Sequence, residues 1–201
     1  DGLLEVWFPG TEGANAIADV VFGDANPSGK LTMSFPQAVG QCPIYYNHYN
    51  TGRPHKKNMR YVSRYQDIPT ESYYPFGFGL SYSKFVYSDI KLSNKILDKH
   101  SKIVVDVKVK NVSDVAGEEV IQLYIQDLVG SVVRPVKELK AFKKVKILQK
   151  EEVDVKFAIS EEMLKFWNES MKFEAEEGEF KVFVGSSSNE EDLLSDTFTL
   201  K

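Results

Sequence analysis

The sequence contains a single cysteine, Cys42, among its 201 residues. One thiol cannot form a disulfide within the chain, and it excludes a metal site built from several cysteines. No run of about 18 uncharged apolar residues is present, so the sequence predicts no membrane-spanning helix. It also lacks a starting methionine and the charged-then-apolar pattern of a secretory signal. The chain opens on Asp1 and Gly2 and runs directly into an apolar segment, which predicts a piece of a longer protein.

What is present is a globular composition with an uneven distribution of charge. Hydrophobic residues make up 42% of the chain and charged residues 27%, too apolar for a disordered chain and too polar for a membrane protein. The net charge is −4, yet residues 1–40 carry one basic and five acidic side chains, and residues 41–85 carry six basic and two acidic ones. Eight of the ten tyrosines lie within residues 45–82. These shifts predict three segments, 1–40, 41–85 and 86–201.

The first segment has the pattern strand, helix, strand of an α/β domain. Residues 3–8 and 31–35 read as strands, and Thr11 is a candidate N-cap for a helix over residues 12–22 that Gly23 ends. The apolar stripe of that helix has helical spacing: Ala14, Ile17, Ala18 and Val21. One helix over two strands leaves a sheet face bare. We therefore expect residues 1–40 to be poorly ordered or self-associated, unless they pack on the connector that follows.

The third segment alternates apolar and polar residues with a period of two. The predicted strands are residues 85–92, 103–110, 120–126, 139–148, 153–159, 180–184 and 197–200, with a helical turn over 160–167. Turn residues separate them, as in an immunoglobulin-like antiparallel β-sandwich. The inward side chains of the alternating strands are expected to form the core: Val105, Val107, Val109, Ile121, Leu123, Ile125, Val155, Phe157, Phe180 and Val182.

Residues 41–85 form a long connector without regular periodicity, and its chemistry can be read in several ways. Before the connector, the turn at 9–13 lacks the spacing of a phosphate-binding loop. The histidines of the whole chain, His48, His55 and His100, belong to no metal-binding or nucleophile motif. Tyrosines interleaved with basic residues suit single-stranded nucleic acid, but the basic residues do not cluster on one element. Residues 45–54 also combine aromatic rings with Asn, His and Arg, a mixture suited to sugars. Composition alone does not separate these readings from packing.

Several motifs together make the chain similar to the C-terminal part of family 3 glycoside hydrolases. Residues 7–13 (WFPGTEG) and 16–31 (AIADVVFGDANPSGKL) resemble the end of that family's α/β sandwich domain. Residues 74–82 (YPFGFGLSY) resemble the motif leading into its fibronectin type III-like domain, and 117–124 (GEEVIQLY) and 134–142 (RPVKELKAF) resemble that domain itself. The resemblance covers essentially the whole chain. It implies an α/β remnant over 1–40, a connector over 41–85 and a fibronectin type III-like β-sandwich over 86–201.

The resemblance implies a retaining glycosidase, which needs two carboxyl groups about 5 Å apart. In the family the nucleophile is an Asp in a Ser-Asp-Trp motif of an N-terminal barrel, and the acid/base is usually a Glu of the second domain. Here Val6 precedes Trp7 and Phe166 precedes Trp167, so the motif is absent. The matched part of the second domain places the acid/base before Asp1. We therefore assign no catalytic residue in this chain and expect it to be inactive alone.

One substrate-binding role is implied by the resemblance. In some members, an arginine on a loop after the second domain contacts the leaving-group sugar. Arg53 is the candidate here, with Tyr49 and Asn50 as neighbours. Alternatively, Arg53 only holds its loop through a backbone carbonyl or a nearby acid.

The sequence is thus interpreted as part of a β-glucosidase that acts on terminal β-linked glucose or related sugars. Its partners would be a glucoside or oligosaccharide and the missing barrel and α/β domains of the same chain, with no nucleic acid, membrane, metal or cofactor. A homodimer through residues 3–35 is left open, and the resemblance favours a periplasmic or secreted location. The rival interpretations are a non-catalytic carbohydrate-binding module and a protein-interaction module.

Overall fold

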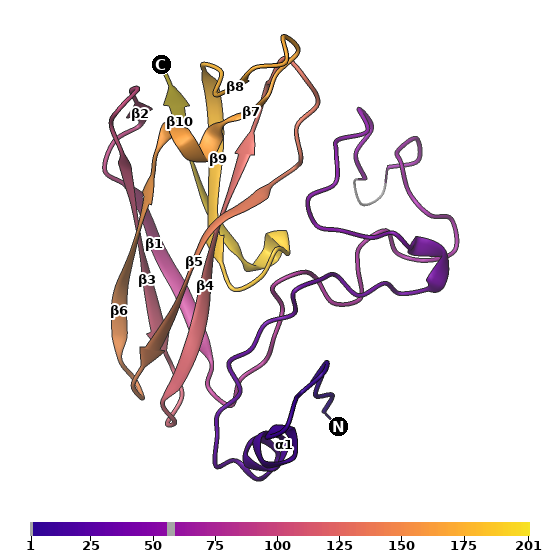
Figure 1. Cartoon of the computed structure of the whole chain (residues 1–201), viewed down its shortest axis with the longest axis vertical. Helices are drawn as coiled ribbons and strands as arrows, with labels where there is room; N and C mark the ends of the chain where they lie inside the picture. Colours follow the sequence, from indigo (N-terminus) through magenta and orange to yellow (C-terminus); the bar gives the residue numbers. More distant parts are fainter. Residues whose placement is uncertain (1, 56–58) are drawn as a thin grey trace.

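The computed structural model describes residues 2–55 and 59–201, and its regular structure is mainly β, in a sandwich that begins at Phe85 (Figure 1). One sheet has the strand order β1-β3-β6, and the other has the order β2-β10-β9-β4-β5. A separate hairpin pairs β7 with β8, and the one parallel pairing named among these strands joins β10 to β2. The bounds are β1 (Phe85–Leu92), β2 (Ile96–Leu97), β3 (Ile103–Asn111), β4 (Gly117–Asp127), β5 (Glu138–Ile147), β6 (Glu152–Ile159), β7 (Phe166–Trp167), β8 (Phe173–Glu174), β9 (Gly178–Gly185) and β10 (Leu193–Leu200).

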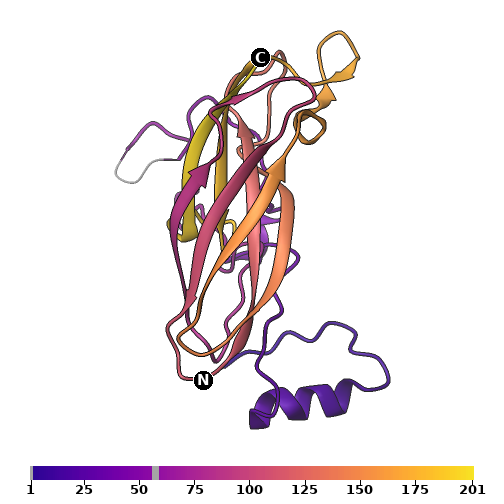
Figure 2. The same cartoon turned by 90° about the vertical axis from the view of Figure 1, so that its left-hand side faces the viewer.

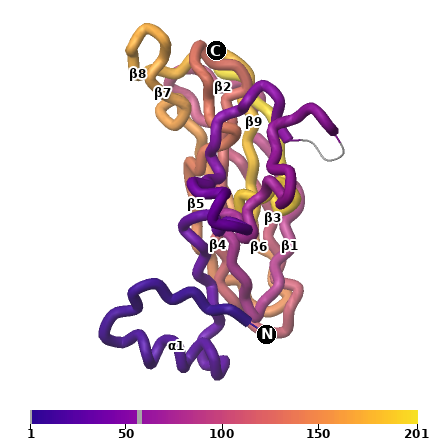
Figure 3. The backbone as a smooth tube through the Cα atoms, turned by 90° about the vertical axis from the view of Figure 1, so that its right-hand side faces the viewer, coloured from indigo at the N-terminus to yellow at the C-terminus, as the bar shows by residue number. Residues whose placement is uncertain are grey.

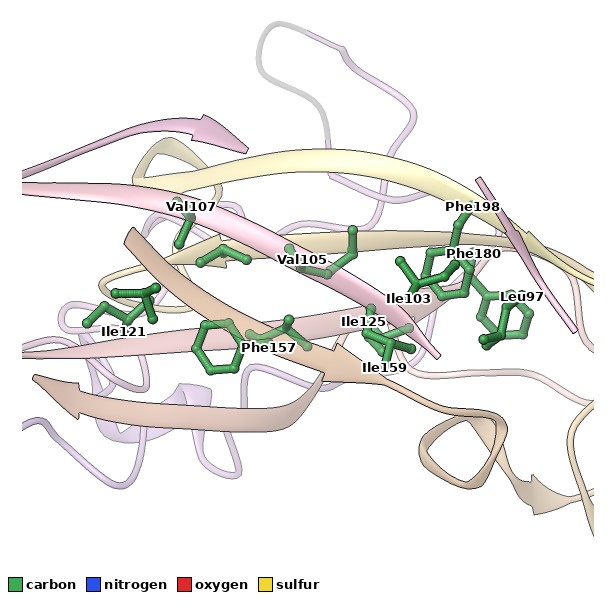
Figure 4. Close-up of a cluster of buried hydrophobic side chains, with 14 of the residues drawn as sticks. Leu97, Ile103, Val105, Val107, Ile121, Ile125, Phe157, Ile159, Phe180 and Phe198 are labelled. Carbon is green, nitrogen blue, oxygen red and sulfur yellow. The ribbon is translucent and has the colours of Figure 1, made fainter. Parts of the chain in front are cut away.

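The sandwich core is formed by the side chains that the alternating pattern predicts. On β3, Val105 and Val107 are completely buried, while Asp106 between them points outward and pairs with Lys156 of β6 at 3.1 Å. All ten predicted core residues are buried. Figure 4 shows side chains from both sheets, among them Phe157 and Phe180, filling the space between them. Burying each such side chain stabilises the fold by about 1.5–3 kcal/mol before entropy is counted.

The seven predicted strands are present, and they differ from the expectation mainly at their ends. The strand predicted over residues 197–200 begins at Leu193, because Leu193 pairs with Gly185 at the start of a continuous ladder with β9. The turn predicted over residues 160–167 is a 3₁₀ helix, η2 (Glu161–Leu164), followed by the short strand β7.

In the first segment, the predicted helix is confirmed but the predicted strands are not formed. Helix α1 (Gly13–Phe22) begins one residue later than expected and ends at Gly23, whose left-handed backbone (φ 86°) suits glycine. Residues 3–8 belong to no strand. Residues 31–35 form no strand either, but they make an isolated bridge and several backbone hydrogen bonds with residues 73–78 of the connector. A strand needs a neighbouring strand for its backbone groups, and none of the strands within residues 2–55 and 59–201 pairs with residues 3–8.

Helix α1 lies beyond one end of the sandwich (Figure 2). Its apolar stripe is poorly covered. Ala14 and Val21 of the predicted stripe are exposed, as are Phe22 and, in the preceding segment, Phe8. Of the helices in the described ranges, none has the length and apolarity needed to cross a membrane.

Asn26 joins the first segment to the sandwich through four hydrogen bonds. Its Nδ2 donates to Ser83 Oγ and to the carbonyl of Ala116, both at 2.9 Å. Its Oδ1 accepts from Ser81 Oγ at 2.8 Å and from the N–H of Tyr82 at 2.9 Å. The amide therefore uses both of its donors and accepts twice, which explains an asparagine in the NPSG motif.

Lys30 forms the second link, through a buried ion pair. Its Nζ lies 3.1 Å from Glu119 Oε2 and donates to the carbonyl of Gly79 at 3.0 Å. The two charged side chains are only 10% and 3% exposed. Tyr87 of the opposite sheet donates to Glu119 Oε1 at 2.8 Å. The carboxylate thus connects both sheets of the sandwich to the segment before it.

Alkaline pH is expected to weaken this arrangement. Burial, reinforced by the charge of Glu119, raises the pKa of Tyr87 well above its ordinary value of 10.0. Above pH 10 the unfolded chain loses a proton that the native state keeps, so stability falls as pH rises, by up to about 1.4 kcal/mol per pH unit for this tyrosine. Urea unfolding at pH 8 and at pH 10.5 measures the loss, which should be smaller for Tyr87→Phe. An equal loss in the variant would assign the effect to other groups.

Candidate functional site

A groove lies where the connector meets two loops of the sandwich. Its volume is about 590 Å³, and its walls include Tyr45, Tyr49 and Glu71 of the connector, and Lys137 and Glu190 of the sandwich. Figure 3 shows the connector running along the outer side of the five-stranded sheet, over β4 and β5. The groove is therefore built from segments far apart in the sequence.

The connector is held on this sheet by aromatic packing. Tyr46 stacks on Phe76, with ring centroids 4.4 Å apart, and meets the edge of Tyr124 at 5.6 Å. The Tyr46 hydroxyl accepts a hydrogen bond from the N–H of Leu139 at 3.1 Å, and burial raises the pKa of Tyr46. Tyr124 belongs to β4, whose alternate side chains fill the core, so it covers the other face of the sheet. Part of the tyrosine-rich pattern is thus explained by packing.

Gln122, also on β4, fixes the connector relative to the loop that forms the opposite wall. Its Nε2 donates to the carbonyl of Gly77 at 3.1 Å and to that of Ser186 at 2.6 Å. The N–H of Ser188 donates to the carbonyl of Phe76 at 2.9 Å. These bonds hold residues 76–77 of the connector and residues 186–188 of the sandwich together beside the groove.

The loop carrying the predicted site residues is attached through its backbone. Tyr49 forms an isolated antiparallel bridge with Pro135, and the N–H of Val136 donates to the carbonyl of His48 at 2.9 Å. The Asn50 side chain accepts from the N–H of Gly52 at 3.1 Å, which closes a tight turn. Tyr49 remains 58% exposed, so a ligand can reach it.

The structure places two of the three predicted residues on the groove wall. Tyr49 and Asn50 line the groove. Arg53 lies just beyond the turn, is exposed and does not line the groove. The carbonyl of Arg53 accepts from the N–H of Ser63 at 2.9 Å. Within the described ranges its guanidinium forms no hydrogen bond and no ion pair.

The sandwich contributes groove residues that the sequence reasoning missed. Lys137, Glu190 and Glu191 all line the groove. Lys137 is buried, its Nζ donates to the carbonyl of Ser188 at 2.8 Å, and burial lowers its pKa. The turn signal at residues 186–189 was visible, but nothing local indicates that this loop meets the connector.

Comparison with known proteins places this arrangement among glycosidases. Residues 1–82 match the Glycosyl hydrolase family 3 C-terminal domain, and residues 119–188 match the Fibronectin type III-like domain. The periplasmic beta-glucosidase of Salmonella typhimurium is 52% identical over 190 residues, which cover 94% of this chain and 25% of that protein. The thermostable beta-glucosidase B of Acetivibrio thermocellus is 41% identical over 192 residues, 94% of this chain and 25% of that protein.

A solved structure extends the similarity to three dimensions. The beta-glucosidase of Listeria innocua in complex with glucose superposes with a TM-score of 0.91 at 49% identity, over 98% of this chain and 27% of that one. The fold thus defines the C-terminal region of a glycoside hydrolase. The chain belongs to glycoside hydrolase family 3, and it spans about a quarter of the length of the relatives named here.

Proposed function

We propose that this chain is the C-terminal quarter of a β-glucosidase that releases terminal β-linked glucose from short oligosaccharides. The observation that carries the proposal is identity of 49–52% to beta-glucosidases across nearly the whole chain, one of them solved with glucose. The Salmonella relative is periplasmic, which supports a periplasmic or secreted location for this protein.

In this proposal the chain supplies support and a substrate contact rather than the reacting carboxyl groups. The nucleophile and the acid/base belong to the barrel and to the earlier part of the α/β domain, as the family resemblance implies. The sandwich stabilises the enzyme and holds the connector. The connector presents Tyr49 and Asn50 in the groove, and Arg53 beside it, to the leaving-group sugar.

A chimera tests the proposal. The last quarter of the Listeria innocua enzyme is replaced by residues 1–201 of this chain, and hydrolysis of an aryl β-glucoside is measured. We expect a folded, active chimera, while the 201-residue chain alone and the Listeria enzyme truncated before the exchanged part are inactive. A chimera that folds cooperatively, yet hydrolyses neither an aryl β-glucoside nor laminaribiose, would contradict the proposal.

The contact by Arg53 predicts a substrate-dependent defect. In the chimera, Arg53→Ala should raise KM for laminaribiose roughly tenfold, because a charge-assisted hydrogen bond to a sugar contributes about 1.5–3 kcal/mol. KM for an aryl glucoside, which lacks the second sugar, should change little. Arg60→Ala, an exposed arginine of the same connector, serves as the control. Equal changes in KM for both substrates would assign Arg53 a structural role.

The groove also keeps the carbohydrate-binding interpretation open, since it exposes Tyr45 and Tyr49 without the rest of the enzyme. Titration of the 201-residue chain with cello-oligosaccharides separates the two functions. Sub-millimolar binding by the 201-residue chain favours a binding module, and no binding favours a supporting role in the enzyme. Binding of a protein partner in place of sugar would favour an interaction module. Whether the protein forms a homodimer is a separate question, which sedimentation of the complete protein tests.

A further inference from the structure

The segment that joins β4 to β5 holds the part of the connector that lines the groove. Three contacts join residues 46–49 of the connector to residues 135–139. They are the bridge between Tyr49 and Pro135, the bond from the N–H of Val136 to the carbonyl of His48 at 2.9 Å, and the bond from the N–H of Leu139 to the Tyr46 hydroxyl at 3.1 Å. The place of residues 46–49 therefore depends on how residues 135–139 are held.

Arg134, which precedes this segment, is held by three elements of the sandwich. Its Nη2 donates to Oε2 of Glu138, at the start of β5, at 3.0 Å. Its Nε lies 3.5 Å from Oδ2 of Asp127, at the end of β4. Its guanidinium carbon lies 3.9 Å from the ring centroid of Phe166, on β7, which is a cation–π contact. Because Arg134 and Glu138 stand on either side of residues 135–137, their bond closes that segment into a short loop.

The pair of Arg134 with Asp127 is a poor source of stability. The two side chains are only 14% and 6% exposed, and within residues 2–55 and 59–201 neither Arg134 Nε nor Asp127 Oδ2 has a hydrogen-bond partner. Burial raises the pKa of Asp127 despite the charge of Arg134. A buried pair with incomplete hydrogen bonding repays its desolvation poorly, so apolar side chains would stabilise the fold as well. What an arginine adds is a planar group with a defined direction toward each of its partners.

We propose that Arg134 is a positioning residue for the groove-lining loop of the connector, and that it fixes the backbone to which Tyr49 and its neighbours are bonded. Arg134 itself does not line the groove, so it acts through Pro135 and Val136. Proline makes this path short and stiff, because its ring fixes φ. The inference rests on the proposed function for the sugar contact of the loop, whereas the position of the loop can be measured without sugar.

Hydrogen exchange of single amides in the 201-residue chain, followed by NMR, tests the position of the loop. Arg134→Lys keeps the charge but loses the planar group. The amide of Val136, which is bonded to the connector, should then exchange roughly tenfold faster, the factor that loss of one charge-assisted contact implies. Lys140 Nζ remains 3.4 Å from Glu138 Oε2, so that carboxylate keeps a cation in the variant.

A second variant and a control separate position from general stability. Phe166→Leu removes the ring beneath the guanidinium and should accelerate exchange at Val136 as Arg134→Lys does. The control is Ile147→Val, a buried residue at the far end of β5. It weakens the whole sandwich, so it should accelerate exchange at Val182 of the central strand β9 but leave Val136 unchanged. Unchanged exchange at Val136 in either test variant, or the same change in the control, would overturn the positioning role.

The chimera measures the consequence for substrate. There, Arg134→Lys should raise KM for laminaribiose by a larger factor than it lowers kcat, because the loop would be displaced while the reacting carboxyl groups belong to other domains. Faster exchange at Val136 with an unaltered KM would support the positioning role and refute the sugar contact of the loop. The two proposals therefore fail on different measurements.

Discussion

Replacing Lys30 by methionine is expected to lower the free energy of unfolding by about 3–5 kcal/mol, because the Glu119 carboxylate then stays buried without its cation. Methionine keeps much of the length of the lysine stem, so the change removes mainly the charge and its hydrogen bond to Gly79. The Tyr87 hydroxyl alone cannot compensate a carboxylate that is 3% exposed. Urea unfolding of the 201-residue chain at pH 7, followed by fluorescence, measures the loss.

The same strand provides a matched control. Glu118, next to Glu119, pairs with Lys144 at 2.8 Å, but these two side chains are about half exposed, 46% and 50% respectively. Lys144→Met should therefore cost less than about 1 kcal/mol. Adding Glu119→Gln to Lys30→Met removes the stranded charge and should recover much of the lost stability. Similar losses for Lys30→Met and Lys144→Met would show that burial does not govern the pair.

Substituting Gly77 by alanine should destabilise the chain by about 3 kcal/mol, from backbone strain and lost hydrogen bonds together. The backbone at Gly77 has φ +80°, and a Cβ there would lie 2.0 Å from Gln122 Oε1. Gln122 cannot move aside freely, because its amide is bonded to Gly77, Ser186 and Tyr124. Displacing Gln122 would also break its hydrogen bonds to Gly77 and Ser186 beside the groove. Thermal unfolding measures the loss of stability, and sugar binding measures the effect on the groove.

Gly23→Ala separates the two contributions to that loss. Gly23 has φ +86°, but no heavy atom lies within 4 Å of the Cβ position, so only the backbone strain of about 1–2 kcal/mol applies. A double-variant cycle with Gln122→Ala isolates the contact between residues 77 and 122. If Gly77→Ala cost no more than Gly23→Ala, steric conflict with Gln122 would be excluded as the cause.

Local sequence patterns predicted the sandwich well, because inward and outward positions alternate along strands that are paired with neighbouring strands. Strand β3 is the clearest case, with Ile103, Val105, Val107 and Val109 all buried. Residues 31–35 have the same kind of pattern but form no strand, although their backbone groups bond to residues 73–78 of the connector. Alternation thus indicates which side chains are buried, whereas a strand also needs a neighbouring segment with a regular, extended backbone.

The groove could be predicted only in part for a related reason. Tyr49 and Asn50 were predicted because the family resemblance pointed to Arg53, and both residues are its neighbours in the same stretch of sequence. Glu190 and Glu191 lie far along the chain, and they reach the groove only through tertiary bonds such as that between Ser188 and Phe76. The Lys30–Glu119 pair, 89 residues apart, was hidden in the same way, although both residues belong to recognised motifs.

The order of Lys30 and Glu119 along the chain has a consequence for synthesis on the ribosome. At about 5–20 residues per second, Lys30 emerges roughly 4–18 s before Glu119. Lys30 carries no desolvation cost while it is in water, and it is already outside the ribosome when β4 packs and buries the carboxylate of Glu119. The opposite order would leave the nascent sandwich with a buried anion and no cation during that interval. The ion pair therefore links completion of the sandwich to the prior arrival of the segment before it.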